Sequence, residues 1–245
     1  MERESFISRV KAFFRLHFFN PKWRCLSCGK EIFEGKYFCD ECEEDLPYID
    51  KYYCEHCGRK LNSPSNYCSS CKEKSIFVDK ARSLFNYDKP IDGFIQQLKY
   101  YDKRFIADIF GEKLANLYRK NYFNADCLCF IPMTNKAKRK RGYNQSELIA
   151  NSLSKQIGVP VMELVSKEKE TVRQAKLSRE ERLKNLKGCF KPKSKKEING
   201  KTILLIDDVL TTGATSEAVA EVLKKKGAKA VYLLTVASVT SKEGY

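Results

Sequence analysis

Two adjacent carboxylates, Asp207 and Asp208, lie between an apolar run and a turn rich in threonine and glycine. The run, residues 203–206, contains only Ile and Leu and predicts a buried parallel strand, and a helix is expected from about Ser216 to Lys226. Ligands of open α/β sheets bind at the carboxyl ends of strands, and a turn that opens a helix offers free N–H groups to an anion. An acid pair that only caps the helix or binds Mg²⁺ is the alternative. The pattern favours a sugar-phosphate site, in which the acids bind a diol and the turn holds the phosphate through Thr211, Thr212, Gly213, Ala214 and Thr215.

Eight cysteines near the N-terminus form an internal repeat. Each copy reads C-x2-C-x10-C-x2-C, and the second follows the first at an offset of 29 residues. Four thiolates satisfy tetrahedral Zn²⁺ and leave no open position, so one or two structural zinc ions are expected. Whether each copy binds its own ion or the copies pair with each other stays open. His56 lies inside the second copy and is expected to be an exposed side chain. The candidate ligands are Cys25, Cys28, Cys39, Cys42, Cys54, Cys57, Cys68 and Cys71.

The amino-acid composition limits which binding partners and which cellular compartment are expected for the protein. Lys plus Arg is 46 against 31 Asp plus Glu, a net charge of +15, which attracts nucleic acid, phosphorylated ligands or anionic membranes unless it only reflects the host's composition. No apolar leader or transmembrane stretch is visible, so the eleven cysteines are expected to stay reduced in the cytoplasm. The N-terminal segment predicts an amphipathic helix that packs on the protein or a partner, with Phe6, Ile7, Val10, Phe13 and Phe14 on its face.

Two basic segments accompany the acid pair. A strand ending at Ile131-Pro132 is followed by an expected loop with five cations, residues 136–141, which suits a pyrophosphate or a nucleic-acid backbone. The second segment, from Ser166 to Lys196, is expected to be a mobile loop and a short helix that closes over a bound pyrophosphate, or else a solvated linker. The candidate nucleic-acid contacts are Lys138, Arg139, Lys140, Arg173, Lys176 and Arg179.

Further strands and helices must position these groups. Alternation predicts a strand over residues 81–87, Pro90 is expected to open a helix, and a second helix is expected over about 105–121. Another helix should end near Ile157, and residues 230–237 predict the last buried strand. Lys99, Lys103 and Arg104 are either a solvated helix end or the border of an anion site. The remaining cysteines are expected to be small core residues rather than metal ligands: Cys127, Cys129 and Cys189.

Taken in order, these motifs resemble the ComF (ComFC-like) late-competence family. The resemblance is carried by the cysteine array, Ile131-Pro132, the run Arg141-Gly-Tyr-Asn-Gln145, the segment 171–182 and the acid-pair stretch. That stretch also resembles the phosphoribosyl-pyrophosphate (PRPP) motif of type I phosphoribosyltransferases. The resemblance implies an α/β fold, a type I phosphoribosyltransferase domain with a parallel sheet flanked by helices, behind a small double zinc ribbon. The expected boundaries are an N-terminal segment at 1–22, the ribbon at 23–75 and the phosphoribosyltransferase-like domain at 76–245.

The resemblance also implies roles. Asp207 and Asp208 would contact the ribose 2′ and 3′ hydroxyls, the turn would wrap the 5′-phosphate, and Mg²⁺ would accompany PRPP. Pro132, Lys136 and Arg141 are expected to complete the PRPP site. Family membership further implies binding of single-stranded DNA and a role in DNA uptake or processing during natural transformation, with a competence helicase or other DNA-processing proteins as partners.

Two alternatives use the same pocket. In one, the chain is an active phosphoribosyltransferase, a glycosyltransferase that moves ribose 5-phosphate from PRPP to an unidentified acceptor and releases pyrophosphate. Its catalytic residues would be Asp207, Asp208 and Arg141. In the other, the protein is a regulatory sensor that binds PRPP but catalyses no transfer. Hypoxanthine-type salvage enzymes resemble the motif but carry an Asp where Thr211 stands, so purine salvage is not expected.

Overall fold

The structure is a computed structural model that describes residues 24–33, 35–72, 77–121, 123–170, 186 and 188–240. The expected N-terminal amphipathic face and the candidates Arg173, Lys176 and Arg179 lie outside the described residues. The chain divides into two compact units, residues 1–46 and residues 47–245. The second cysteine copy therefore belongs to the same compact unit as the sheet, while the boundaries expected at 22/23 and 75/76 stay predictions.

The two cysteine copies fold alike. In the first, the N–H of Cys25 donates to the carbonyl of Lys30 (2.8 Å), and helix α2 (Asp40–Glu44) begins after Cys39 and contains Cys42. In the second, the N–H of Cys54 donates to the carbonyl of Arg59 (2.8 Å), and helix α3 (Ser69–Lys72) begins after Cys68 and contains Cys71. The sequence repeat is thus a structural repeat.

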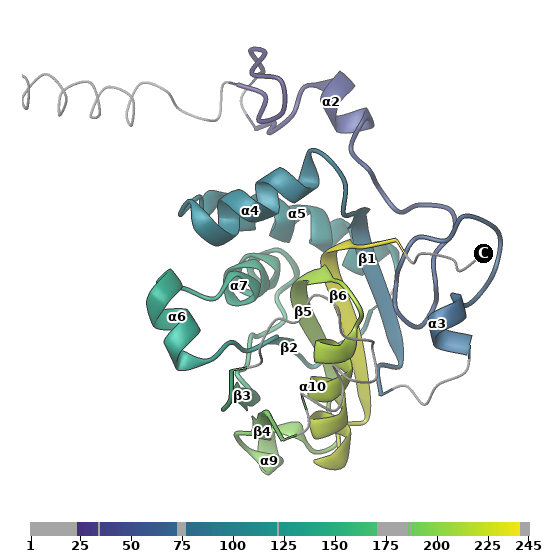
Figure 1. Ribbon diagram of the computed structural model, residues 1–245, viewed down its shortest axis with the longest axis vertical. Helices are drawn as coiled ribbons and strands as arrows, with labels where there is room; N and C mark the ends of the chain where they lie inside the picture. The colour runs from purple at the N-terminus through teal and green to yellow at the C-terminus, as the bar shows by residue number, and fades with distance from the viewer. Residues whose placement is uncertain are drawn as a thin grey trace, which may run out of the picture. The chain divides into compact units, whose positions relative to one another are not determined.

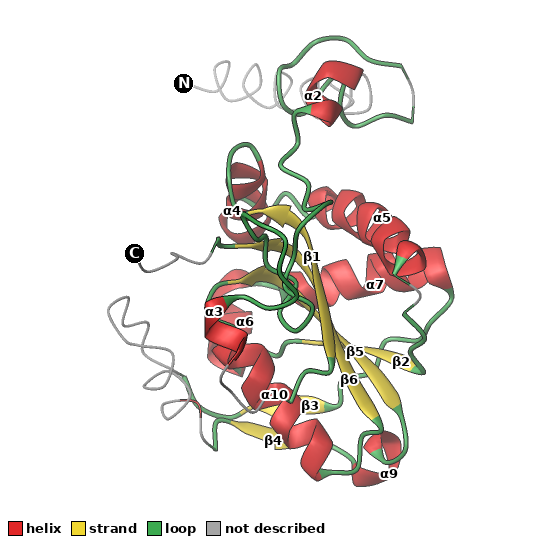
Figure 2. Cartoon of the chain, turned by 90° about the vertical axis from the view of Figure 1, so that its right-hand side faces the viewer, coloured by secondary structure: helices red, strands yellow, loops and turns green. Residues whose placement is uncertain are grey.

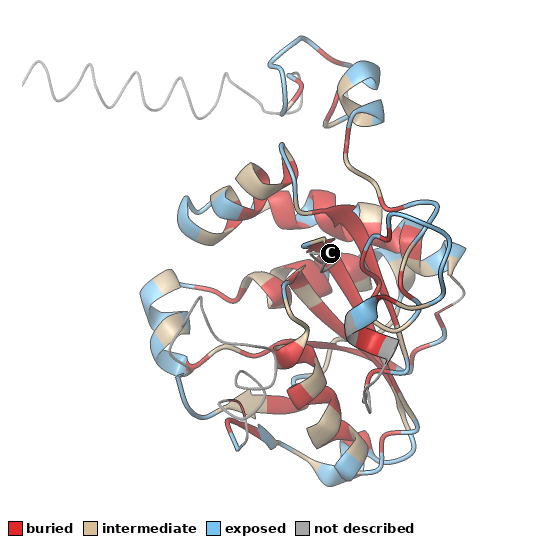
Figure 3. Ribbon diagram, turned by 45° about the vertical axis from the view of Figure 1, so that its right-hand side comes forward, coloured by how far each residue is buried: buried red, intermediate tan, exposed pale blue. Residues whose placement is uncertain are grey.

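Four parallel strands form the central sheet, in the order β1-β6-β5-β2 (Figure 1). They are β1 (Lys80–Asn86), β6 (Ala230–Ser238), β5 (Thr202–Leu210) and β2 (Cys127–Phe130). Parallel sheets are covered on both faces, and their strands therefore read as continuous apolar runs. The strand predicted over residues 81–87 is confirmed as β1, and its residues from Ala81 to Asn86 are all buried instead of alternating with exposed ones. Figure 3 colours most of the sheet as buried.

Helices flank the sheet, as Figure 2 shows. Helix α4 (Ile91–Tyr100) packs on α5 (Phe105–Lys120), α5 packs on β1 and β6, and α7 (Gln145–Ile157) packs on β5 and β2. Helix α10 (Ala214–Lys225) packs on β6 and on the hairpin of β3 (Val165–Lys167) and β4 (Phe190–Pro192). Ile203 and Leu205 share a core with α10, so the alternate residues of β5 point toward α7. A parallel sheet flanked by helices is confirmed.

Three cysteines outside the repeat are core residues, as predicted. Cys127 and Cys129 are fully buried in β2, and Cys189 is 4% exposed in the same core cluster. Burial raises the pKa of Cys127 and raises that of Cys129 to about 12, so both stay neutral thiols. All eleven cysteines are free of disulfide bonds.

The first basic segment is not a loop, contrary to the sequence-based expectation. Residues Asn135–Arg141 form helix α6. The Thr134 hydroxyl accepts a hydrogen bond from the N–H of Ala137 (3.2 Å), and Gly142 ends the helix with φ +88°. A threonine N-cap and a left-handed glycine C-cap stabilise both ends of this short cationic helix.

The second basic segment begins and ends in paired strands. The antiparallel pair β3–β4 joins its two ends, and the four-residue helix α9 (Lys195–Ile198) follows. Residues 171–185 and 187, which include most of the expected mobile loop, lie outside the described residues. Within the described ranges, no helix combines the length and the apolar character that spanning a bilayer requires.

The second cysteine copy covers the free edge of β1. Gly58 forms a parallel bridge with Arg82, and its carbonyl accepts from the N–H of Ser83 (3.3 Å). Arg82 is 3% exposed, and its guanidinium lies 3.3 Å from the centre of the Tyr53 ring. An uncovered edge strand would present unpaired backbone groups to other chains. The ribbon therefore closes this edge of the sheet.

Gly58 and its repeat equivalent Gly29 make a matched test of that contact. Both have positive φ, +70° and +76°, but a Cβ on Gly58 would lie 2.5 Å from the Arg82 Cα, whereas one on Gly29 meets nothing within 4 Å. We expect Gly58→Ala to destabilise the unit 47–245 by about 3 kcal/mol, from overpacking against backbone plus a left-handed alanine. Gly29→Ala should leave the urea unfolding of that unit unchanged. Equal unfolding midpoints for the two variants would contradict the edge contact.

Candidate functional site

The acid pair lies at the carboxyl end of β5. Asp208 is 4% exposed, forms an ion pair with Lys99 of α4 (2.7 Å) and accepts from the N–H of Val209 (2.6 Å). Asp207 is partly exposed and accepts from the Ser146 hydroxyl (2.9 Å) and from the N–H of Asp208 (2.9 Å). Neither acid caps α10, whose N-cap is residue 213, so the helix-cap alternative is wrong.

The two carboxylates differ in their partners, and the difference affects protonation. Burial and the neighbouring Asp208 charge raise the pKa of Asp207 to about 7, against the opposing effect of the Asp208 N–H, Lys99 and Ser146. Lys99 instead pairs directly with Asp208. Asp207 is therefore the carboxylate whose protonation changes near neutral pH, and above that pH it is a charged hydrogen-bond acceptor.

This pKa predicts a pH dependence of stability. Between the unfolded value near 4 and the folded value near 7, the folded chain holds a proton that the unfolded chain has released, so stability falls as pH rises. From pH 6 to pH 8 we expect wild type to lose about 1.4 kcal/mol from this group in urea unfolding. Asp207→Asn should remove that loss, while Asp108→Asn, an exposed acid on α5, should keep it. An identical pH response in wild type and Asp207→Asn would rule out the raised pKa.

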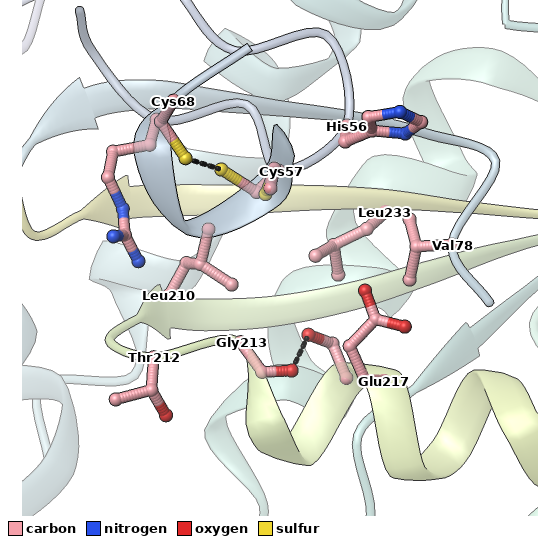
Figure 4. Close-up of a pocket in the computed structure, with 12 residues that line it drawn as sticks. His56, Cys57, Cys68, Val78, Leu210, Thr212, Gly213, Glu217 and Leu233 are labelled. Atoms are coloured by element: carbon pink, nitrogen blue, oxygen red, sulfur yellow. Dashed lines mark hydrogen bonds between the residues drawn. The ribbon is translucent and has the colours of Figure 1, made fainter. Parts of the chain in front are cut away.

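The turn after β5 is suited to an anion. Gly213 has φ +78°, which turns the chain into α10, and Figure 4 shows Thr212 and Gly213 just before that helix. Thr212 accepts from the N–H of Ala214 (3.4 Å), and the Ser216 hydroxyl donates to the Gly213 carbonyl (2.9 Å). Among the described residues, the N–H groups of Thr212 and Gly213 have no acceptor. Free amides at the start of a twelve-residue helix form a phosphate-binding arrangement.

The run Arg141–Gln145 positions the site more than it lines it. The Tyr143 hydroxyl donates to the carbonyl of Leu98, which fixes the end of α4 next to Lys99. Asn144 caps α7 by accepting from the N–H of Ser146 (3.0 Å) and donates to the carbonyl of Ile131 (3.0 Å). This network orients Ser146, the Asp207 partner.

The other predicted PRPP contacts surround the site to different extents. Pro132 is buried directly after Ile131, whose N–H donates to Ile206 of β5 (3.0 Å). Lys136 is 81% exposed and lies 3.7 Å from Glu170. Among the described residues, Arg141 contacts Gln145 and the Tyr100 ring rather than the acid pair. The structure thus brings Pro132 to the acid-pair strand, and it places the Lys136 and Arg141 contacts elsewhere.

Sequence reasoning left Lys99 undecided and missed Ser146. Lys99 has only 15% of its side chain exposed and pairs with Asp208, so the solvated-end alternative is wrong for this residue. The signal available was a lysine in the last turn of an amphipathic helix, which is common on solvated helices as well. Ser146 carried no signal, because its partner lies on a different element.

The predicted nucleic-acid contacts on α6 are not equivalent. Lys138 pairs with Glu147 (2.7 Å), so its charge is partly compensated. Arg139 and Lys140 are exposed and form no ion pair with any residue that the structure describes. Arg173, Lys176 and Arg179 lie outside the described residues.

The cysteines of each repeat copy form a separate cluster. The sulfur atoms of Cys25, Cys28, Cys39 and Cys42 lie within 4.8 Å of one another, and so do those of Cys54, Cys57, Cys68 and Cys71. The Cys28–Cys39 and Cys57–Cys68 sulfur separations are both 3.8 Å. Zn–S bonds of about 2.3 Å in a tetrahedron give an S–S edge of about 3.8 Å, so both clusters fit a structural zinc ion. Pairing between the copies is therefore not the arrangement found.

His56 is not the exposed side chain that the sequence suggested. Its ring stacks on Tyr67 with centroids 4.6 Å apart, and its Nδ1 is buried with no hydrogen-bond partner among the described residues. Figure 4 shows the imidazole directed away from the sulfur atoms of Cys57 and Cys68. It is not a member of the thiol cluster.

Comparison with known proteins assigns the family. Residues 144–244 match the phosphoribosyl transferase domain family, and residues 16–72 match the double zinc ribbon domain family. Competence protein F of Haemophilus influenzae is 27% identical over 84% of this chain and 86% of its own length. Competence protein ComFC of Bacillus subtilis is 29% identical over 60% of this chain and 58% of its own length. The chain is a ComF-like protein.

Other relatives of this ComF-like protein cover it less completely. DNA utilization protein YhgH of Escherichia coli K12 is 30% identical over 60% of this chain and 66% of its own length. Among solved structures, a glutamine PRPP amidotransferase from B. subtilis is 18% identical over 53% of this chain and 25% of that chain, with a TM-score of 0.37. A hypoxanthine phosphoribosyltransferase from Staphylococcus aureus is 16% identical over 54% of this chain and 62% of that chain, with a TM-score of 0.35. TM-scores this low add no support beyond the family matches.

Proposed function

We propose that this ComF-like protein binds PRPP with Mg²⁺ and single-stranded DNA, and that it acts in the cytoplasm on DNA taken up during natural transformation. The observation that carries the PRPP part is the pairing of a partly exposed carboxylate with free turn amides at one strand end. Asp207 has an accessible acceptor for a ribose hydroxyl, and the N–H groups of Thr212 and Gly213 have no acceptor among the described residues. A sugar phosphate satisfies both at once.

The charges around the acid pair fit this ligand. Lys99 neutralises Asp208, so Asp207, with its pKa raised to about 7, is the acid of the pair whose charge faces an anionic ligand. Mg²⁺ binds through one or two carboxylates plus substrate phosphates rather than through a full protein cage. Asp207 is the residue that would hold it together with PRPP oxygens, and the ion would offset the pyrophosphate charge. The protein's own contribution is orientation, through Ser146 on one Asp207 oxygen.

Titration calorimetry with PRPP and Mg²⁺ tests the pocket. Asp207→Ala/Asp208→Ala should lower affinity at least about a hundredfold, because the ribose contact of Asp207 and the Asp208–Lys99 ion pair beside it are both lost. Asp92→Ala/Asp108→Ala, on α4 and α5, removes the same charge away from the turn and should bind like wild type. Absence of binding by wild type would refute the PRPP site. Pyrophosphate release with any base, orotate or oligonucleotide would instead favour the active transferase.

The DNA part rests on a surface where aromatic and basic side chains meet, here called the α4–α6 surface. Tyr100 and Tyr101 are 59% and 68% exposed at the end of α4. The Arg141 guanidinium lies 5.4 Å from the centre of the Tyr100 ring, so the ends of α4 and α6 adjoin. Arg139 and Lys140 add exposed charge on α6. Single strands bind where bases stack on aromatics and cations follow the phosphates.

Salt-dependent binding of an oligo-dT strand tests this surface. Arg139→Gln/Lys140→Gln should reduce the slope of log affinity against log salt by about 1.4, since each phosphate contact on a single strand contributes about 0.7. Tyr101→Ala should cost about 1–3 kcal/mol with the slope unchanged, because it removes stacking rather than charge. Lys195→Gln/Lys196→Gln on α9 removes two equally exposed charges and should have no effect. An equal loss of DNA affinity in the α9 variant would mean that DNA binding depends only on the net charge of the protein.

A further inference from the structure

The second zinc ribbon does more than close the sheet edge. We propose that Arg59, from this ribbon, positions the phosphate-binding turn, so that the second ribbon supports PRPP binding. This inference rests on the proposed function, because it names a positioning residue for the same turn. The residue belongs to the cysteine repeat and lies far from the turn in sequence.

The contact itself is direct and buried. Arg59 is 7% exposed, and its Nη2 donates a hydrogen bond to the backbone carbonyl of Thr211, the first residue of the turn. Arg59 lines one small cavity together with Cys57, Thr212 and Gly213, in the region that Figure 4 shows between the ribbon and the start of α10. The Arg59 side chain thus connects the second ribbon to the turn.

Peptide geometry explains what this bond does. The carbonyl of Thr211 and the N–H of Thr212 belong to one planar trans unit, so they point in opposite directions. When Arg59 holds the Thr211 carbonyl on the ribbon side, the Thr212 N–H must point away from the ribbon. That N–H has no acceptor among the described residues and is free for a phosphate oxygen. Fixing a donor before the ligand arrives lowers the ordering cost of binding.

The charge of Arg59 acts in the same direction. Its Nε is buried without a hydrogen-bond partner, and no carboxylate in the described ranges forms an ion pair with it. A buried, uncompensated cation is costly, and a nearby anion relieves the cost. A phosphate in the turn would place such an anion close by. Ligand binding is therefore favoured by the charge as well as by the fixed peptide.

The first copy of the repeat lacks this arrangement. The residue equivalent to Arg59 is Lys30, whose side chain is 61% exposed and pairs with Glu41 (3.1 Å). The second copy has Ser70 at the position of Glu41, so the repeat offers Arg59 no carboxylate there. The same position in the repeat thus serves a surface ion pair in one copy and the turn contact in the other.

Two measurements on the full chain test the proposal, with Lys30→Gln as the matched control. In calorimetry, Arg59→Gln should weaken PRPP·Mg²⁺ binding about tenfold or more, and Arg59→Lys should stay within about threefold of wild type, because it keeps a charged donor. In ¹⁵N relaxation without ligand, the order parameter of the Thr212 amide should fall from about 0.85 toward 0.6 in Arg59→Gln. Lys30→Gln should change neither, and every variant should keep two zinc ions per chain by elemental analysis.

Each outcome decides between specific alternatives. Wild-type affinity and a rigid Thr212 amide in Arg59→Gln would overturn the proposal. So would loss of zinc in that variant, because Arg59 would then act by holding the ribbon together. If wild type itself binds no PRPP, the proposed function fails, and the order parameter alone decides whether Arg59 fixes the turn.

Discussion

Two neighbouring carboxylates at the end of a buried strand are the constraint on which the rest of the site depends. Burying an unpaired carboxylate costs several kcal/mol, and a second negative charge beside it raises the cost. Asp208 is buried and must be paired, and Lys99 reaches it from α4. Asp207 keeps part of its surface and is held by the Ser146 hydroxyl. One acid is thus neutralised by the protein, and the other stays partly exposed at the end of the strand.

This constraint accounts for elements that look unrelated in sequence. The Lys99 position depends on the end of α4, which the Tyr143 hydroxyl fixes through Leu98. Ser146 depends on the first turn of α7, which Asn144 caps. The run from Arg141 to Gln145 therefore serves the acid pair from a distance, by holding two helix ends. The run affects the site by fixing the positions of these helix ends. Arg141 itself contacts Tyr100 and Gln145 rather than the acids.

The sequence predicts those features that are formed by residues close together in the chain. The strand, acid pair and turn of residues 203–215 lie in one stretch, and the cysteine spacing specifies four-thiol clusters without knowledge of the fold. The Lys99–Asp208 pair, the Gly58–Arg82 bridge and the burial of the His56 Nδ1 are tertiary, so no periodicity reveals them. Helix α6 is a different case, because its signals were local. Thr134 and Gly142 are recognisable caps, but the run of cations between them favoured a loop.

The two cysteine copies show how a repeat can diverge while its metal chemistry stays the same. Both clusters have the sulfur spacing of tetrahedral zinc, so selection on metal binding alone would not separate them. Their glycines already differ, since a Cβ on Gly58 would lie 2.5 Å from the Arg82 Cα, whereas a Cβ on Gly29 would meet nothing within 4 Å. Packing against β1 brings the second copy close to the turn after β5, and a long buried cation at position 59 can then reach the Thr211 carbonyl. A module whose cysteine clusters fit a structural zinc thereby contacts the turn after β5, and metal-dependent rigidity of the ribbon would extend to that turn.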